Sequence, residues 1–152
     1  MIELINIKDY MCDLKEVVDM ITQEWGKFFR SSKEEKYSKI KQAIESNQQY
    51  PQIYVLKDNK KIVGSFTIKE HDLEDCDLTP WLACVIIKKE LRGSGYGRII
   101  LQHIKKVIEE NYPEIYLTTQ HIGYYEKIGF EFVKHVSHND EIDRLYTKKA
   151  FQ

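Results

Sequence analysis

The sequence predicts an α+β protein with a mixed, mostly antiparallel sheet flanked by helices. Strand-like segments follow one another without an intervening helix at 53–68 and at 130–148, which is typical of antiparallel hairpins. Between them, an apolar run at 81–87 leads through a glycine-rich turn into a helical pattern at 99–112. With 152 residues, the chain is expected to form one domain, residues 1–152, with a core of its own.

The N-terminal half predicts one strand, two helices and one hairpin. Apolar residues recur at helical spacing from Leu14 to Phe28, so the first helix is expected to be amphipathic. A serine pair followed by acidic residues at 31–35 is typical of a helix start. In chain order, the expected elements are a strand at 3–7, a helix at 9–29, a helix ending near 45, a polar connection at 46–51, and strands at 53–56 and 62–68 around a turn at 58–61.

The C-terminal half begins with an acidic loop and then alternates strands with helices. The helix at 99–112 carries an apolar face that includes Ile100, Ile104 and Ile108. Gly129 is expected to end a short helix, because glycine favours the left-handed C-cap. The expected elements are a loop at 70–79, a buried strand at 81–87, a strand at 115–119, a short helix at 124–128, and strands at 130–136 and 144–148 around a turn at 138–140.

Composition and charge exclude several classes of function. The net charge is −1 with 31% charged residues, so no large field of one sign is available to steer nucleic acid. Cys12, Cys76 and Cys84 form no C-x-x-C pair and are expected to be reduced thiols of a cytoplasmic protein. No signal peptide is recognised and no apolar run approaches the ~20 residues that span a bilayer. The five histidines lack metal-ligand spacing, which predicts no metal.

The turn at 92–98 has the composition of a phosphate-binding site. N–H groups at the start of a helix have no internal partner, so they can hold the oxygens of an anion. Gly95 and Gly97 lack a Cβ, which lets a phosphate approach the main chain closely. Arg92 and Arg98 are expected to add positive charge beside it. The predicted binding residues are Arg92, Gly93, Ser94, Gly95, Tyr96, Gly97 and Arg98.

Three known phosphate loops compete for this turn. The dinucleotide fingerprint G-x-G-x-x-G does not fit, because three glycines alternate here and the third is misplaced. The nucleotide-triphosphate loop G-x-x-x-x-G-K-[ST] does not occur. The coenzyme A pyrophosphate loop, R/Q-x-x-G-x-G/A, is matched fully by Arg92, Gly95 and Gly97. An ordinary glycine turn is the alternative for this string taken alone.

A second segment, GYYEKIGF at 123–130, resembles the FYEKLGF signature of the GNAT superfamily of N-acetyltransferases. One helix and one strand separate it from the glycine-rich turn, as they do in that superfamily. The segment 80–83 is also similar to a subset of its members. On these motifs in this order, the chain is identified as a member over roughly residues 50–148, while the N-terminal third matches only in element order.

This resemblance implies two adjacent parallel strands, 81–87 and 115–119, that splay apart. The pantetheine arm of acetyl-CoA would enter the gap and pair with main-chain groups of Val85, Ile86 and Ile87. Tyr125 would act as general acid toward the coenzyme sulfur, since a thiol has a pKa of about 8.5 and a phenol of about 10. Packing against pantetheine is the alternative role for this tyrosine.

No sequence motif identifies the general base or the acceptor site, in contrast to the coenzyme site. Some relatives carry a glutamate near the start of the strand before the loop, where this chain has Trp81. His71 in the acidic loop has a suitable ordinary pKa of about 6.5, although such charge runs are usually solvated surface. A base acting through water, or none, is also open. His121 lies four residues before Tyr125, which predicts a shared helix face. The candidates for the substrate site are Glu70, His71, Asp75, Asp77, Trp81 and His121.

The expected function is transfer of an acetyl group from acetyl-CoA to a primary amine. An acidic mouth would attract a small cationic amine, such as a polyamine, an aminoglycoside-like antibiotic or an amino-acid derivative. The alternatives are a protein acetyltransferase acting on a lysine or an N-terminus, and a non-catalytic coenzyme A-binding regulatory module. Retention of Tyr125 beside an intact loop favours an enzyme, and near-zero net charge argues against a tRNA substrate. Assembly as a homodimer is a further option.

Overall fold

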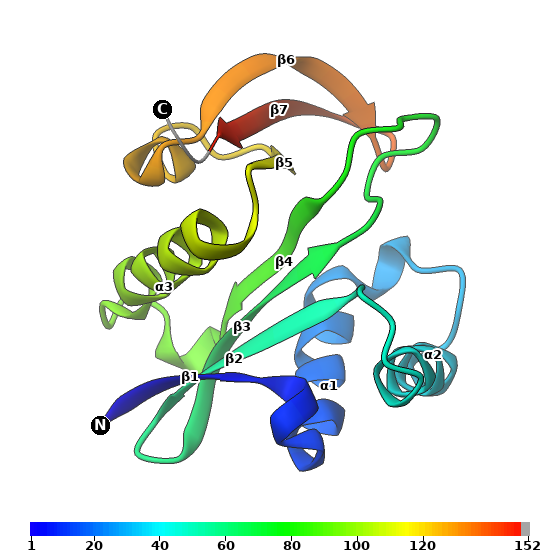
Figure 1. Cartoon of the computed structure of the whole chain (residues 1–152), viewed down its shortest axis with the longest axis vertical. Helices are drawn as coiled ribbons and strands as arrows, with labels where there is room; N and C mark the ends of the chain where they lie inside the picture. The colour runs from blue at the N-terminus through cyan, green and yellow to red at the C-terminus, as the bar shows by residue number, and fades with distance from the viewer. Residues whose placement is uncertain (150–152) are drawn as a thin grey trace.

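A computed structural model describes residues 1–149 of the chain. Seven strands form one sheet in the order β1-β2-β3-β4-β5-β7-β6, with α1 and α2 on one face and α3 on the other (Figure 1). Every neighbouring pair is antiparallel except β4–β5, so the predicted α+β architecture is confirmed. The elements are β1 (Ile2–Asn6), α1 (Leu14–Trp25), α2 (Lys33–Glu45), β2 (Gln52–Asp58), β3 (Lys61–Lys69), β4 (Trp81–Ile87), α3 (Tyr96–Asn111), β5 (Glu114–Thr119), β6 (Glu131–His138) and β7 (Glu141–Lys149).

The first helix is shorter than its sequence pattern predicted. The single helix expected at 9–29 is divided, because 3-10 turns at Ile7–Asp9 and Met11–Asp13 precede α1 and another at Gly26–Phe28 follows it. Tyr10 interrupts the helical path with φ −153° and ψ 68°, which lie outside the helical region. Since 3-10 turns repeat at nearly the same spacing as an α-helix, the apolar pattern alone does not separate them.

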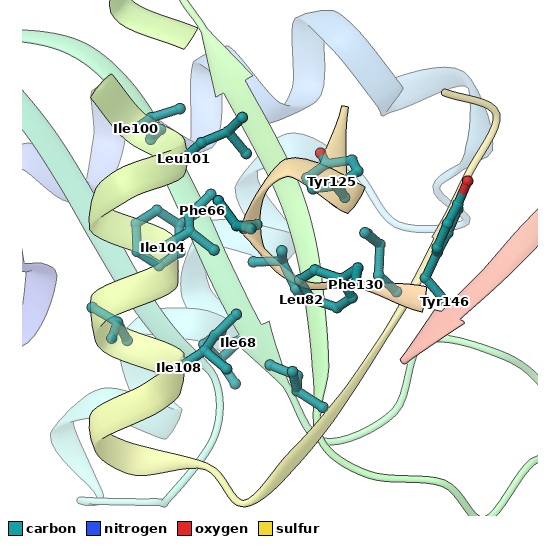
Figure 2. Packing of buried hydrophobic residues seen from close by; sticks show 14 of the residues in the cluster. Phe66, Ile68, Leu82, Ile100, Leu101, Ile104, Ile108, Tyr125, Phe130 and Tyr146 are labelled. Carbon is teal, nitrogen blue, oxygen red and sulfur yellow. The ribbon is translucent and has the colours of Figure 1, made fainter. Parts of the chain in front are cut away.

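Two hydrophobic clusters lie on opposite faces of the sheet. On one face, α1 packs on Ile53, Val55 and Ile86. On the other, α3 packs on the central strands together with Tyr125, Phe130 and Tyr146 (Figure 2). Burying each large apolar side chain contributes about 1.5–3 kcal/mol, so β3 and β4 are held firmly between the two layers. The α3 face contains Phe66, Ile68, Leu82, Ile100, Leu101, Ile104 and Ile108.

Two tight turns close the hairpins where the sequence predicted them. Asn59 and Lys60 have φ 50° and 68°, and Asn139 and Asp140 have φ 52° and 62°. Paired left-handed residues are characteristic of two-residue hairpin turns, whose twist matches that of the strands. The second hairpin is longer than predicted, because β6 runs to His138 and β7 begins at Glu141.

The two central strands separate after a single point of contact. β4 and β5 pair only at Trp81 and Tyr116, beyond which no ladder joins them. On its other edge, β4 contains a bulge, marked by Cys84 with φ 53°. Gly64 of β3 lies so close to this region that an added Cβ would sit 2.7 Å from the Ile86 carbonyl oxygen. The predicted splay is therefore present, and it starts beside a bulge in a tightly packed strand.

Candidate functional site

The glycine-rich loop delivers the start of α3 to the carboxyl end of β4. Gly93 and Gly95 have φ values of 83° and 91°, which residues other than glycine adopt only with backbone strain. Gly95 is the N-cap of α3, and its carbonyl accepts the first helical hydrogen bond, from the Ile99 N–H at 3.4 Å. The loop is exposed. Its geometry thus leaves the first-turn N–H groups of a sixteen-residue helix available to an anion.

Side chains of the loop anchor it to the rest of the fold. Arg92 donates from Nε to the Ile87 carbonyl at 3.0 Å and from Nη2 to Glu24 Oε2 at 3.1 Å. Tyr96 donates its hydroxyl to Asp58 Oδ2 at 2.7 Å. The guanidinium of Arg92 therefore forms an ion pair with Glu24 of α1. This ion pair partly neutralises the positive charge that was expected beside the phosphate. Arg98 is exposed and makes no ion pair among residues 1–149.

The edge of β4 that faces the gap presents free main-chain groups. The Lys88 N–H donates to the Val63 carbonyl of β3, and Ile86 pairs with Ser65 of the same strand. Because main-chain groups alternate along a strand, those of Val85 and Ile87 face the opposite edge. The two strands have already separated at this point. Among the three residues predicted to bind pantetheine, Val85 and the Ile87 N–H thus face the gap, whereas the Ile87 carbonyl accepts the hydrogen bond from Arg92 and Ile86 is paired within the sheet.

Tyr125 begins a 3-10 helix, Tyr125–Ile128, that Gly129 ends in the left-handed conformation with φ 96°, as predicted. Its side chain is 6% exposed and packs edge-on against Tyr124 and Phe130. Figure 2 shows its hydroxyl pointing away from Leu82 and Phe130. Burial raises the pKa of Tyr125 well above the ordinary value of a phenol. The hydroxyl is consequently protonated at neutral pH and can donate a proton.

Tyr124 joins this helix to the phosphate loop. Its hydroxyl donates to the Gly97 carbonyl at 3.1 Å, and its ring is half-buried against the α3 cluster. A Cβ at position 97 would lie 3.2 Å from the same hydroxyl oxygen. The two sequence motifs, far apart in the chain, therefore meet directly.

The acidic loop is mostly solvated. Glu70, His71, Asp75 and Asp77 are exposed, and the one ion pair among them joins His71 Nε2 to Glu70 Oε1 at 3.6 Å. Trp81, in contrast, is fully buried and donates from its indole nitrogen to the Leu78 carbonyl at 2.6 Å. These predicted substrate residues are thus not gathered into one cluster, and Trp81 serves the packing of the sheet.

The predicted helix face shared by His121 and Tyr125 is wrong. His121 lies before the 3-10 helix and is exposed, with its ring 5.9 Å from that of Tyr124. A four-residue spacing aligns side chains only where both residues belong to one α-helix. The segment at 120–124 is instead a loop.

A polar cluster that the sequence did not reveal lies at the far ends of β3, β5 and the β6–β7 hairpin. Asp72 Oδ1 accepts a hydrogen bond from Lys69 Nζ at 3.0 Å, and its Oδ2 lies 3.4 Å from Thr118 Oγ1. His138 Nδ1 lies 3.3 Å from the same Thr118 oxygen and 3.2 Å from Asp143 Oδ2. Three stretches of the chain, 69–72, Thr118 and 138–143, thus bring these side chains together, and no local motif marks the set. This acceptor-side cluster comprises Lys69, Asp72, Thr118, His138 and Asp143.

Neither a membrane span nor a metal centre is found in the described part of the chain. No helix among residues 1–149 combines the length and apolar character needed to cross a bilayer. Within the same range, no three His, Cys, Asp or Glu side chains gather as metal ligands would.

Comparison with known proteins points to one family. The family model described as "Acetyltransferase (GNAT) domain" matches residues 49–132. No curated protein matches the sequence significantly. Among solved structures, spermidine N-acetyltransferase from Vibrio cholerae in complex with CoA and spermine is 18% identical with a TM-score of 0.71, covering 95% of this chain and 94% of that one.

Two further structures share the fold at similar identity. An aminoglycoside 6'-N-acetyltransferase complexed with coenzyme A is 14% identical with a TM-score of 0.70, covering 100% of this chain and 98% of its own. A dodecameric structure of the Vibrio cholerae spermidine enzyme is 16% identical with a TM-score of 0.73, covering 98% and 94%.

Proposed function

The chain belongs to the GNAT acetyltransferase superfamily, and we propose that it transfers the acetyl group of acetyl-CoA to the primary amine of a small cationic molecule. One observation carries the proposal: the gap between β4 and β5 opens beside the phosphate loop and the buried, protonated Tyr125. The loop supplies an anion site, the strand edge supplies main-chain hydrogen bonds, and the phenol supplies a proton.

The residues around the gap fit acetyl-CoA as a cosubstrate. The start of α3 would hold the pyrophosphate with N–H groups, and Gly95, beside which an added Cβ would meet no atom within 4 Å, would let it approach the main chain. The missing Cβ of Gly97 instead makes room for the Tyr124 hydroxyl. Main-chain groups of Val85 and the N–H of Ile87 would pair with the pantetheine amides, as an added strand pairs with a sheet edge. Placing the thioester against a rigid strand holds it in a reactive orientation.

Acetyl transfer requires an amine to attack the thioester carbonyl while a thiolate leaves. Tyr125 would donate its proton to the departing sulfur. The phenol is protonated at neutral pH, and burial raises its pKa further, so this donation would need the bound coenzyme to bring the sulfur into hydrogen-bond contact with the hydroxyl. The step forms a carbon–nitrogen bond, breaks the carbon–sulfur bond, and moves one proton from nitrogen and another onto sulfur. A main-chain N–H at the β4 bulge would stabilise the developing oxyanion.

The acceptor is proposed to be a cation because carboxylates surround the acceptor side of the gap. Asp72 and Asp143 belong to the polar cluster, and Glu70, Asp75 and Asp77 are in the neighbouring loop. The fold-sharing enzymes that act on spermidine and on an aminoglycoside make polyamines and aminoglycosides the first compounds to test.

A screen of acceptors tests this proposal. Thiol release from acetyl-CoA is measured over polyamines, aminoglycosides, amino acids and lysine-containing peptides, with coenzyme binding followed by calorimetry. We expect turnover with one of the small cationic amines. A preference for peptides would replace the proposal by a protein acetyltransferase, and tight coenzyme binding without turnover would indicate a regulatory module. Light scattering on the same sample measures whether the protein forms the proposed homodimer.

A further inference from the structure

The acceptor-side cluster and Tyr125 lie on opposite faces of the sheet. Ile115 and Leu117 of β5 point into the α3 cluster, to which Tyr125 also belongs. Because side chains alternate along a strand, Thr118 points to the other face. It stands on the part of β5 that has already separated from β4. The hydroxyl of Thr118 therefore connects the edge of the gap to the cluster behind it.

The hydrogen bonds of His138 determine which ring nitrogen is free. Nδ1 lies 3.2 Å from the carboxylate of Asp143, which can only accept a hydrogen bond when ionised. A lone pair on Nδ1 would be repelled by that carboxylate, so Nδ1 carries the hydrogen and donates it. The other nitrogen, Nε2, then holds the lone pair, and Asp143 keeps the ring in this tautomer.

The ring of His138 is partly open to solvent and lies beside a buried carboxylate. The side chain of His138 is 21% exposed, whereas that of Asp143 is 11% exposed. The charged groups that face His138 are Asp143 and the cross-strand neighbour of His138, Glu141, on β7 and, across Thr118, Asp72 and its partner Lys69.

From this arrangement we infer that His138 is the general base of the reaction and that Asp143 and Thr118 position its ring. This inference rests on the proposed function and adds to it the residue that accepts the proton. As the amine nitrogen bonds to the acetyl carbon and the carbon–sulfur bond breaks, the nitrogen's proton passes to Nε2 of His138. Tyr125 gives its proton to sulfur, and the two side chains then recover their starting states by exchange with solvent.

Replacement of the imidazole tests the inference. With spermidine or whichever amine the screen finds active, kcat of His138→Ala is expected to fall ~10²-fold or more, the usual contribution of a positioned base. The KM for acetyl-CoA should stay within about twofold, because His138 lies on the opposite face from the phosphate loop. Added imidazole should restore part of the lost kcat, since a free base can occupy the space left by the ring.

A histidine on the same strand provides the matched control. His135 of β6 is exposed, packs against Phe132, and has no carboxylate partner among the described residues. His135→Ala should keep kcat within about twofold, with no response to imidazole. Asp143→Asn keeps the imidazole but removes its orienting charge, and it should lower kcat about tenfold or more. Melting curves of all three variants establish that they are folded.

The pH profile separates a base from a structural residue. In the unmodified protein, kcat should fall toward acid pH, and this acid limb should disappear in His138→Ala. An undiminished kcat, or a loss without imidazole rescue and with an unchanged acid limb, would overturn the inference while leaving the acetyltransferase proposal intact. If His138→Ala does not fold, the same acid limb measured in Asp143→Asn decides, and an unchanged limb overturns the inference. Failure of the unmodified protein to release thiol with any amine would instead contradict the proposed function.

Discussion

The two sides of the β4–β5 gap are built in different ways. The side proposed to bind the coenzyme, called the coenzyme side, uses two continuous stretches of chain, 85–98 and 123–130, whose backbone conformations and buried Tyr125 carry the groups assigned to it. The proposed acceptor side is assembled from three separate stretches, 69–72, Thr118 and the hairpin 138–143, whose polar side chains meet through the register of β5, β7 and β6. A coenzyme common to a superfamily can be held by local main-chain geometry, whereas a particular acceptor needs side chains brought together by the sheet.

The two sides also differ in how firmly they are held. On the coenzyme side, the Tyr96 hydroxyl donates a hydrogen bond to Asp58, the Tyr124 hydroxyl donates one to the Gly97 carbonyl, and Tyr125 is buried. On the acceptor side, the loop at 70–79 exposes most of its charges to solvent. We therefore expect substitutions on the coenzyme side to have large effects on every acceptor, and those in the acidic loop to have small effects that depend on the acceptor.

The largest effect is expected for Gly95→Asp, which should weaken acetyl-CoA binding and leave the acceptor side unchanged. The carboxylate would stand at the start of α3, where it takes the place of the phosphate and repels it. Affinity for acetyl-CoA in calorimetry should fall ~10²-fold or more, with the fold retained because nothing lies within 4 Å of the added Cβ. Gly95→Ala shares the backbone strain without the charge and should lose much less. Normal affinity in Gly95→Asp would disprove the assignment of the pyrophosphate site.

Tyr125→Phe should lower kcat ~10²-fold or more while coenzyme affinity stays nearly normal. The change keeps the ring that packs against Tyr124 and Phe130 and removes only the hydroxyl. With an acyl donor whose thiolate is a better leaving group, the loss of kcat in Tyr125→Phe should be smaller, because that thiolate needs less help from a proton donor. Since burial raises the pKa of Tyr125, kcat of the unmodified protein should not decline through deprotonation of this phenol up to about pH 9.

Tyr124→Phe is the control for that variant, because it removes a neighbouring hydroxyl that bonds the Gly97 carbonyl. It should affect coenzyme affinity more than kcat. An unchanged kcat in Tyr125→Phe would make Tyr125 a packing residue, and the coenzyme side would then bind without contributing to the chemistry.

An effect of intermediate size, on stability, is expected for a substitution between β3 and β4, the central strands that support both sides of the gap. In Gly64→Ala, the added Cβ would lie 2.7 Å from the Ile86 carbonyl oxygen and from Ile87 Cδ1, so β3 and β4 would have to move apart. Such overpacking typically costs about 1–3 kcal/mol of the free energy of unfolding, measurable by denaturant titration. Equal stability of Gly64→Ala and the parent would mean that the strands separate easily here.

The smallest effect is expected in the acidic loop. Changing Asp75 and Asp77 together to Asn should raise KM for a polyamine a few-fold and weaken its dependence on salt, because exposed charges act through a screened field. The KM for acetyl-CoA should not change. If the KM for the amine is also unchanged, the loop is solvated surface and charge selection depends on Asp72 and Asp143 alone.

Much of the coenzyme side could be predicted from sequence because its signals are local. Gly93, Gly95 and Gly129 mark left-handed backbone, and the two-residue hairpin turns are marked in the same way by Asn59 and Asn139. The predicted helix at 9–29 was wrong in its ends, and the helix face proposed for His121 does not exist. Both errors have the same cause: the helical spacing of side chains was assumed to continue through residues whose backbone is not α-helical.

The sequence by itself determined the fold class, the glycine-rich turn before α3 and the short helix that begins at Tyr125, because each depends on residues within a few positions of one another. Only the tertiary structure decided that Glu24 neutralises Arg92, that Trp81 is buried, and that Thr118, His138 and Asp143 meet. The physical reason is that strand register and the splay of β5 from β4 place these side chains. Both depend on the packing of two helical layers against the whole sheet, which no segment of the chain specifies alone.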